Sequence, residues 1–283
     1  MARARELDIE YKDAEQIGKM RGAGLVVAEV LERLRTAVAP GVSTGELDEL
    51  AEAAIRSAGA VPSFLGYQGY PASICTSVNE QIVHAIPSRD AVLRDGDLIS
   101  IDCGAILDGW HGDAAITVPV GTVRPELLRM ARAAEDAMWA GIAAGARGAR
   151  SGCGRLTDIS YAIETAIRRA GRYGIVEGYG GHGIGSEMHQ DPFVLNKGRP
   201  QHGPRLEPGL ALAIEPMLTM GKPKTLELAD GWTVVTADGS VAAHVEHTVA
   251  FCGDGVWVLT AFDGGRGRLG DLVTSRQAAS VPD

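Results

Sequence analysis

Two aspartates, Asp102 and Asp113, lie in an apolar, β-forming stretch at positions 98–118. An Asp-Gly pair at 108–109 divides this stretch, which is a strong signal for a two-residue hairpin turn. The turn predicts that Asp113 lies opposite Gly104, which shares a sheet face with Asp102 because side chains alternate along a strand. The two carboxylates are therefore expected to project from one face as diagonal cross-strand neighbours, about 7–8 Å apart at the backbone.

The apolar surroundings of these two acids restrict how they can be charged. Two bare carboxylates among Ile, Leu, Val and Trp need a shared proton, basic partners or metal ions. Nearby basic partners are missing, because no Lys or Arg occurs between residues 95 and 123. The alternative is a pair of solvated acids on the rim of a hairpin, and this stretch alone does not decide between the two.

Three further residues combine an ionisable side chain with an apolar or glycine-rich setting. His182 lies among glycines, Glu215 ends an apolar run directly before a proline, and Glu246 lies within Ala-Ala-His-Val-Glu-His-Thr-Val. Each acid alone is more simply explained by a salt bridge or by solvent, but together four carboxylates in a dry pocket need cations. Two divalent ions satisfy them, and carboxylates with one imidazole favour Co, Mn, Fe(II) or Zn. Such paired ions lie about 3.5–4 Å apart and activate a bridging water.

Helical and strand patterns predict the elements that position these residues. A first helix is expected at 13–39 with Asp13 as its N-cap, and a second helix follows the Ser43–Glu46 capping box and ends at Gly59. Two more helices are expected at 125–143 and at 156–170. A glycine-rich connector is expected at 145–154. Strands are expected at 74–78 and 208–214, and a second hairpin at 231–251 across Asp238-Gly239.

The composition is that of a globular enzyme. The 283 residues are 45% hydrophobic and 22% charged, and the formal net charge of −9 argues against a broad nucleic-acid footprint. Four scattered cysteines without a C-x-x-C pair fit a reducing compartment. We expect no signal peptide, since no apolar run follows the two arginines near the start, and no apolar stretch is long enough to span a bilayer. We expect a cytoplasmic protein with one domain over 1–262 and a loosely ordered tail over 263–283.

Five segments, in order and without large insertions, resemble those of bacterial type I methionine aminopeptidases. They are Asn79-Glu-Gln-Ile-Val-His84-Ala-Ile-Pro, Asp102-Cys-Gly through His111-Gly-Asp113, Gly181-His182-Gly-Ile-Gly, Ile214-Glu215-Pro216 and Glu246-His-Thr. The similarity runs from about residue 10 to 262. It implies an α+β pita-bread fold, in which two pseudo-symmetric halves share a curved antiparallel β-sheet covered by helices. It also implies removal of the N-terminal methionine before a small second residue, in a chain without the extra segments of type II or eukaryotic type I relatives.

The same resemblance implies roles for twelve residues. Asp102, Asp113, His182, Glu215 and Glu246 would bind two divalent metal ions, and Glu215 would also act as base toward the bridging water. His84 would contact the substrate near the scissile amide, and His189 would hydrogen-bond the scissile carbonyl. One metal ion would take up the free α-amine of the substrate. The methionine pocket would be lined by Tyr67, Tyr70, Cys75, Met188 and Trp232, which suit a thioether; position 188 departs from the family, where an aromatic residue is expected.

Two other functions remain open from the sequence. A Xaa-Pro dipeptidase or aminopeptidase of the same fold keeps most of the metal residues, but such relatives usually carry an extra N-terminal domain. A non-catalytic pita-bread protein that binds RNA or the ribosome is expected to lose metal ligands, whereas this chain retains all five. We therefore expect a monomeric hydrolase whose partners are nascent polypeptide N-termini, with transient ribosome docking and no sequence-specific nucleic-acid or membrane binding.

Overall fold

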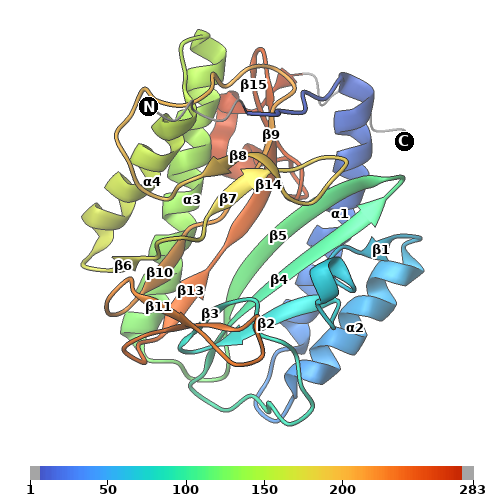
Figure 1. The fold of residues 1–283 in the computed structure, drawn as a ribbon, viewed down its shortest axis with the longest axis vertical. Helices are drawn as coiled ribbons and strands as arrows, with labels where there is room; N and C mark the ends of the chain where they lie inside the picture. The colour runs from blue at the N-terminus through green and yellow to red at the C-terminus, as the bar shows by residue number, and fades with distance from the viewer. Residues whose placement is uncertain (1–6, 276–283) are drawn as a thin grey trace.

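A curved antiparallel sheet forms the centre of the computed structural model, which describes residues 7–275 (Figure 1). Its strands follow the order β1-β4-β5-β14-β9-β7-β8, with β2 beside β4 and β15 beside β14. These strands are β1 (Val61–Pro62), β2 (Ile74–Val78), β4 (Leu98–Leu107), β5 (Trp110–Pro119), β7 (Gly181–Gly183), β8 (Gln190–Val194), β9 (Ala211–Ile214), β14 (Glu246–Cys252) and β15 (Gly255–Val258). Strands from both halves of the sequence thus meet where β5 pairs with β14.

Two smaller sheets of three strands each complete the β-structure. One has the order β13-β10-β6, and the other has the order β11-β12-β3. Their bounds are β3 (Gln81–Val83), β6 (Gly174–Ile175), β10 (Met217–Thr219), β11 (Thr225–Glu227), β12 (Val234–Thr236) and β13 (Ala242–His244). The short β13 ends two residues before β14 begins, so the chain passes from a small sheet directly into the central sheet.

Two pairs of helices cover the central sheet, one pair for each half of the chain (Figure 1). The pairs are α1 (Ala14–Ala37) with α2 (Thr44–Ser57), and α3 (Pro125–Ser151) with α4 (Leu156–Ala170). The predicted N-caps are confirmed, because the side chains of Asp13 and Ser43 each complete a capping box. Helix-facing residues of β4, such as Ile99 and Ile101, alternate with residues of the opposite face such as Asp102, so the helices cover one face and leave the other for polar groups.

The predicted hairpin at 98–118 is confirmed in its register. Leu107 pairs with Trp110 and Gly104 pairs with Asp113. Between the strands, Asp108 and Gly109 have φ angles of 52° and 81°, which is the left-handed geometry of a type I′ turn. The register places Asp102 and Asp113 on one face, as the alternation of side chains requires.

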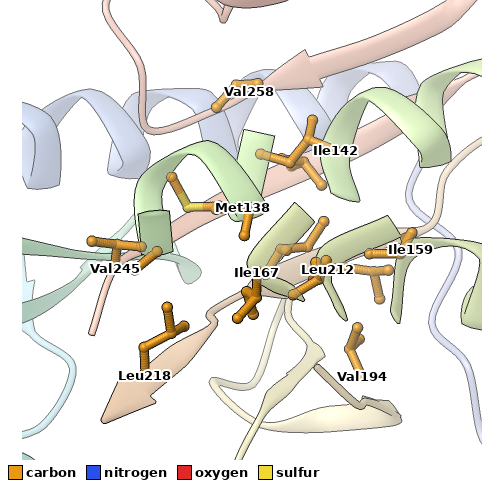
Figure 2. Packing of buried hydrophobic residues seen from close by; sticks show 14 of the residues in the cluster. Met138, Ile142, Ile159, Ile167, Val194, Leu212, Leu218, Val245 and Val258 are labelled. Atoms are coloured by element: carbon orange, nitrogen blue, oxygen red, sulfur yellow. The ribbon is translucent and has the colours of Figure 1, made fainter. Parts of the chain in front are cut away.

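Helix α3 is longer than the sequence indicates, because it continues through the predicted connector at 145–154 to Ser151. Its glycines allow close packing. A Cβ at Gly141 would lie 2.6 Å from Ile163, and one at Gly145 would lie 2.8 Å from Phe251. Figure 2 shows this interface, where Met138 and Ile142 of α3 pack with Ile159 and Ile167 of α4 over the sheet residue Leu212. Tertiary packing therefore outweighs the low helix propensity of glycine.

The predicted second hairpin across Asp238-Gly239 is wrong. The strands on either side of this turn do not pair with each other, since β12 pairs with β11 and β3, whereas β13 pairs with β10. The Asp238 carboxylate instead accepts hydrogen bonds from the Lys222 backbone N–H at 2.8 Å and from the Ser240 hydroxyl at 2.7 Å. The bond from Lys222 ties the turn to the loop after β10.

The described part of the C-terminal tail is packed on the domain, unlike the loose segment that the sequence predicts. Short helices form at α5 (Arg266–Leu269) and η2 (Gly270–Leu272). Leu269 and Val273 are buried in the same core as α3, and Val273 forms a bridge with Val256. Residues 276–283 of the predicted tail lie outside the described residues.

Candidate active site

A cavity of about 250 Å³ lies on the face of the sheet opposite the covering helices. Every candidate site residue predicted from the sequence lines it: Tyr67, Tyr70, Cys75, His84, Asp102, Asp113, His182, Met188, His189, Glu215, Trp232 and Glu246. Phe64 and Gln68 complete the lining. Residues separated by up to 182 positions thus meet in one small space.

Strand register explains why three of the acids converge. Ala115 of β5 pairs with Asp102 of β4 on one side and with Glu246 of β14 on the other. Directly paired residues project from the same face, so the two carboxylates flank the small side chain of Ala115. Asp113 lies two residues before Ala115 and therefore points to the same face.

His182 and Glu215 enter the cluster from the second half of the chain. His182 lies in the middle of β7, and Glu215 directly follows β9. The His182 Nδ1–H lies 2.9 Å from the Gly183 carbonyl and donates to it, which leaves the lone pair of Nε2 facing the Glu215 carboxylate at 3.7 Å. One ligand atom each from Asp113, His182 and Glu246 lies within 4.8 Å of the others, which is close enough to share one ion.

Burial and mutual repulsion keep these carboxyl groups from ionising freely. Burial raises the pKa of Asp102 to about 6, and burial with the charge of neighbouring carboxylates raises the pKa of Asp113 and Glu246 well above the usual range. Burial alone would raise the pKa of Glu215, but the nearby imidazoles of His244, His182 and His84 outweigh burial and lower it. Glu215 is thus the acid of the group that is most readily kept as a carboxylate.

The donor atoms of the cluster fit divalent cations. One carboxylate oxygen each of Asp102, Asp113 and Glu246 is buried without a hydrogen-bond partner among the described residues. Unpaired buried oxygens are unfavourable unless a cation or proton satisfies them. Carboxylates with one imidazole are a ligand set that Mn, Fe(II), Co and Zn accept.

His244 is a site residue that sequence reasoning missed. Its Nε2 lies 3.4 Å from Glu215 and 3.9 Å from Glu246, and the residue is buried. Its backbone N–H donates to the hydroxyls of Ser100 and Thr117, which fixes its place at the end of β13. A signal was present in the sequence, because His244 lies two residues before Glu246 in an apolar run, and alternation along the single strand predicted there would place both on one face.

Two more histidines border the cluster and are neutral near pH 7. Burial, aided by the charge of His182, lowers the pKa of His189 to about 4, and burial also lowers the pKa of His84. His189 Nδ1 lies 2.9 Å from the Tyr67 hydroxyl, and its ring centroid lies 4.3 Å from that of His182. His84 has a φ of 60° and an edge contact with the Tyr179 ring. A neutral imidazole can donate one hydrogen bond to a substrate oxygen.

An apolar chamber adjoins the polar cluster. Phe64, Tyr70, Cys75 and Met188 form its buried walls, and Tyr67 and Trp232 pack against them. The Tyr70 and Trp232 rings meet edge to face with centroids 5.0 Å apart. Met188 is buried here, so a flexible thioether fills the position where the resemblance led us to expect an aromatic ring. One cavity thus joins an acid cluster to a hydrophobic chamber.

Sequence comparison identifies the family that carries this arrangement. The profile of metallopeptidase family M24 matches residues 18–251. The chain belongs to metallopeptidase family M24. Among M24 relatives, methionine aminopeptidase 1 of Mycobacterium tuberculosis is 55% identical over 257 residues, a match that covers 89% of this chain and 95% of that protein. Methionine aminopeptidase 1 of Bacillus subtilis is 45% identical over 249 residues and is covered over 98% of its length.

Solved structures of M24 proteins agree with the fold. The methionine aminopeptidase from Rickettsia prowazekii has a TM-score of 0.85 and 38% identity, with 90% of this chain and 100% of that chain covered. The Xaa-Pro dipeptidase from Bacillus anthracis has a TM-score of 0.68 at 22% identity, and this chain covers 61% of it, so that likeness shows the fold alone. The predicted resemblance and the pita-bread fold are confirmed. Among the helices of residues 7–275, none has the length and apolar character needed to cross a membrane.

Proposed function

We propose that this M24 protein hydrolyses the amide bond after an N-terminal methionine when the second residue is small. The observation that carries the proposal is the single cavity that joins the acid cluster to an apolar chamber. Relatives that match over nearly their whole length are methionine aminopeptidases. We assign nascent protein N-termini as substrates, in the cytoplasm, for a monomer that docks transiently at the ribosome.

Asp102, Asp113, His182, Glu215 and Glu246 are the residues that hold two divalent ions in this proposal. When bound, such ions neutralise the carboxylates and make water nucleophilic at neutral pH. Glu215, whose pKa is lowered, stays ionised and accepts a proton at its carboxylate. His244 lies against that carboxylate and keeps it ionised.

The neutral histidines act on the substrate. His189 donates a hydrogen bond to the scissile carbonyl oxygen, where negative charge develops during attack. Tyr67 contacts the other nitrogen of His189 and fixes the orientation of the ring. His84 also lines the cavity, and its neutral imidazole donates a hydrogen bond near the scissile amide. The proton that the Glu215 carboxylate accepts from water is passed to the leaving amine.

The apolar chamber binds the methionine side chain. Aromatic rings from Phe64, Tyr70 and Trp232 surround a space that suits a flexible thioether, because sulfur packs well against rings. Cys75 is paired with Asp102 across β2 and β4, so it places the chamber directly beside the acid cluster. In this proposal, the amide that follows the methionine lies next to Glu215 and His189.

Peptide hydrolysis tests the proposal directly. Release of methionine is measured from Met-Ala-Ser and from Met-Leu-Ser, and Xaa-Pro dipeptides serve as the competing substrate class. We expect rapid methionine release from Met-Ala-Ser and not from Met-Leu-Ser or the Xaa-Pro dipeptides. A chelator should abolish this activity, and added Mn, Co, Fe(II) or Zn should restore it. Cleavage of Xaa-Pro substrates instead would indicate the dipeptidase activity, and binding of RNA without any cleavage would indicate the non-catalytic alternative.

A further inference from the structure

Lys12 is the only lysine or arginine that residues 7–275 bury, and it lies outside the cavity described above. Its ammonium group donates to the Glu10 carbonyl at 2.9 Å and to the Gln190 side-chain oxygen at 3.0 Å. It also lies 3.3 Å from the Glu10 carboxylate. Burying a charge is unfavourable unless it is paired, so this arrangement calls for an explanation.

Glu10 binds the same region of the second half of the chain. Its carboxylate accepts hydrogen bonds from the Ser186 backbone at 3.1 Å, from the Ser186 hydroxyl at 2.8 Å and from the Gln190 amide at 2.7 Å. We call residues 8–12 the N-terminal strap and residues 184–190 the His189 loop. The strap, in dark blue ahead of α1, crosses the upper part of the molecule in Figure 1.

The strap and the His189 loop pack closely at Gly185. A Cβ at Gly185 would lie 2.2 Å from the Glu10 carboxylate and 2.7 Å from the Lys12 ammonium. The strap is anchored at its other end, where the Lys12 backbone N–H donates to the Gly209 carbonyl at 2.8 Å. It therefore connects the start of β9, which leads to Glu215, with the loop that carries His189.

The His189 loop carries two residues of the cavity, Met188 and His189. We propose that Lys12 and Glu10 are positioning residues, which hold the His189 loop so that the imidazole meets the scissile carbonyl. This inference rests on the role of His189 in the proposed function. A misplacement of about 1 Å at a reacting group can slow turnover by up to about a hundredfold.

A purely stabilising role explains the buried lysine less well. Buried ion pairs add little net stability and can often be replaced by apolar side chains of similar volume. Their hydrogen bonds are directional, however, and here the bond from Lys12 to Gln190 joins two segments 178 positions apart. Lys12→Met keeps most of the volume and removes the charge, which separates the two roles.

The test compares Lys12→Met with Lys19→Met, an exposed lysine of α1 that pairs only with Glu15 in the salt bridges of the described chain. Methionine release from Met-Ala-Ser is measured well below each melting temperature. We expect Lys12→Met to lower kcat about tenfold or more with a smaller change in KM, and Lys19→Met to match the wild type. Hydrogen–deuterium exchange should rise in the His189 loop and stay unchanged in α3.

Three results would overturn the positioning role. The first is an unchanged kcat in Lys12→Met, and the second is a uniform rise in hydrogen–deuterium exchange across the chain. The third is recovery of kcat in the double variant Lys12→Met, Glu10→Gln, because this variant restores the charge balance but not the hydrogen bonds. If Lys12→Met does not fold, Ser186→Ala removes one bond to Glu10 and should show the same local rise in exchange. Absence of methionine release by the wild type contradicts the proposed function alone, because the exchange measurement needs no turnover.

Discussion

Asp102 and Glu246 flank Ala115 in one row of the central sheet, although they lie on strands from opposite halves of the chain. The row continues to Cys75, which pairs with Asp102 on its other side. A small residue between the two acids leaves open space in the cavity, since every larger side chain at this position would project between them. The site therefore depends on the size of a residue that carries no functional group.

The first prediction concerns that residue. Ala115→Leu should lower metal binding and kcat by at least about tenfold, because its side chain occupies the space between the carboxylates. Ala114→Leu is the matched control, since Ala114 is equally buried but belongs to the core that faces α1. Both variants should lose stability by about 1–3 kcal/mol from overpacking, whereas only Ala115→Leu should lose metal, as measured by calorimetric titration. Equal metal affinity in the two variants contradicts the prediction.

The second prediction concerns His244, which contacts Glu215 without being one of the five predicted ligands. His244→Ala should lower kcat or metal affinity by roughly 10–100-fold, as expected when a group that orients a ligand is removed. His202→Ala, at an exposed histidine, should leave both unchanged. Steady-state kinetics with metal titration provides the measurement, and wild-type values for His244→Ala would remove this residue from the site.

The third prediction concerns the apolar chamber. Trp232→Ala should raise KM for Met-Ala-Ser by about tenfold with a smaller effect on kcat, because the ring packs on Tyr70 and borders the methionine side chain. Trp232→Phe should recover part of the loss. Tyr161→Ala, at an exposed aromatic residue of α4, serves as control. An unchanged KM in Trp232→Ala would show that the chamber does not bind methionine.

Local sequence signals accounted for the parts of the site that lie close together in the chain. The Asp-Gly turn was sufficient to predict the register of β4 and β5, and thus the shared face of Asp102 and Asp113. The N-cap predicted at Asp13 and the capping box predicted at Ser43 likewise marked the starts of α1 and α2. These features depend on a few neighbouring residues, so they can be predicted without knowledge of the tertiary structure.

Features set by distant contacts could not be predicted in this way. The length of α3 depends on how its glycines fit against Phe251 and Ile163, which no local propensity encodes. The turn at Asp238 was misassigned because its side chain binds the Lys222 backbone, 16 residues away. Lys12 gave no signal at all, since its partners in the His189 loop lie about 178 positions along the chain.

The fourth prediction concerns removal of metal and its dependence on pH. Burial raises the pKa of Asp102 to about 6 in the folded protein, above its value in the unfolded chain. A raised carboxyl pKa destabilises the folded protein at pH values at which the carboxyl group is ionised. This destabilisation disappears as the pH falls from about 6 toward 4, because the group becomes protonated in the folded protein first. The chelated protein should therefore gain roughly 1 kcal/mol from this group between pH 7 and pH 5.

The metal-loaded protein should show the opposite trend, because protons compete with metal for the same carboxylates and weaken binding at low pH. Urea unfolding at both pH values, with and without chelator, measures the two trends. Asp102→Asn is the control, because it removes the titrating carboxyl group at this position and should reduce the gain of the chelated protein by about the same 1 kcal/mol. Parallel pH trends in the chelated and metal-loaded proteins would show that the buried carboxyl cluster is not where metal binds.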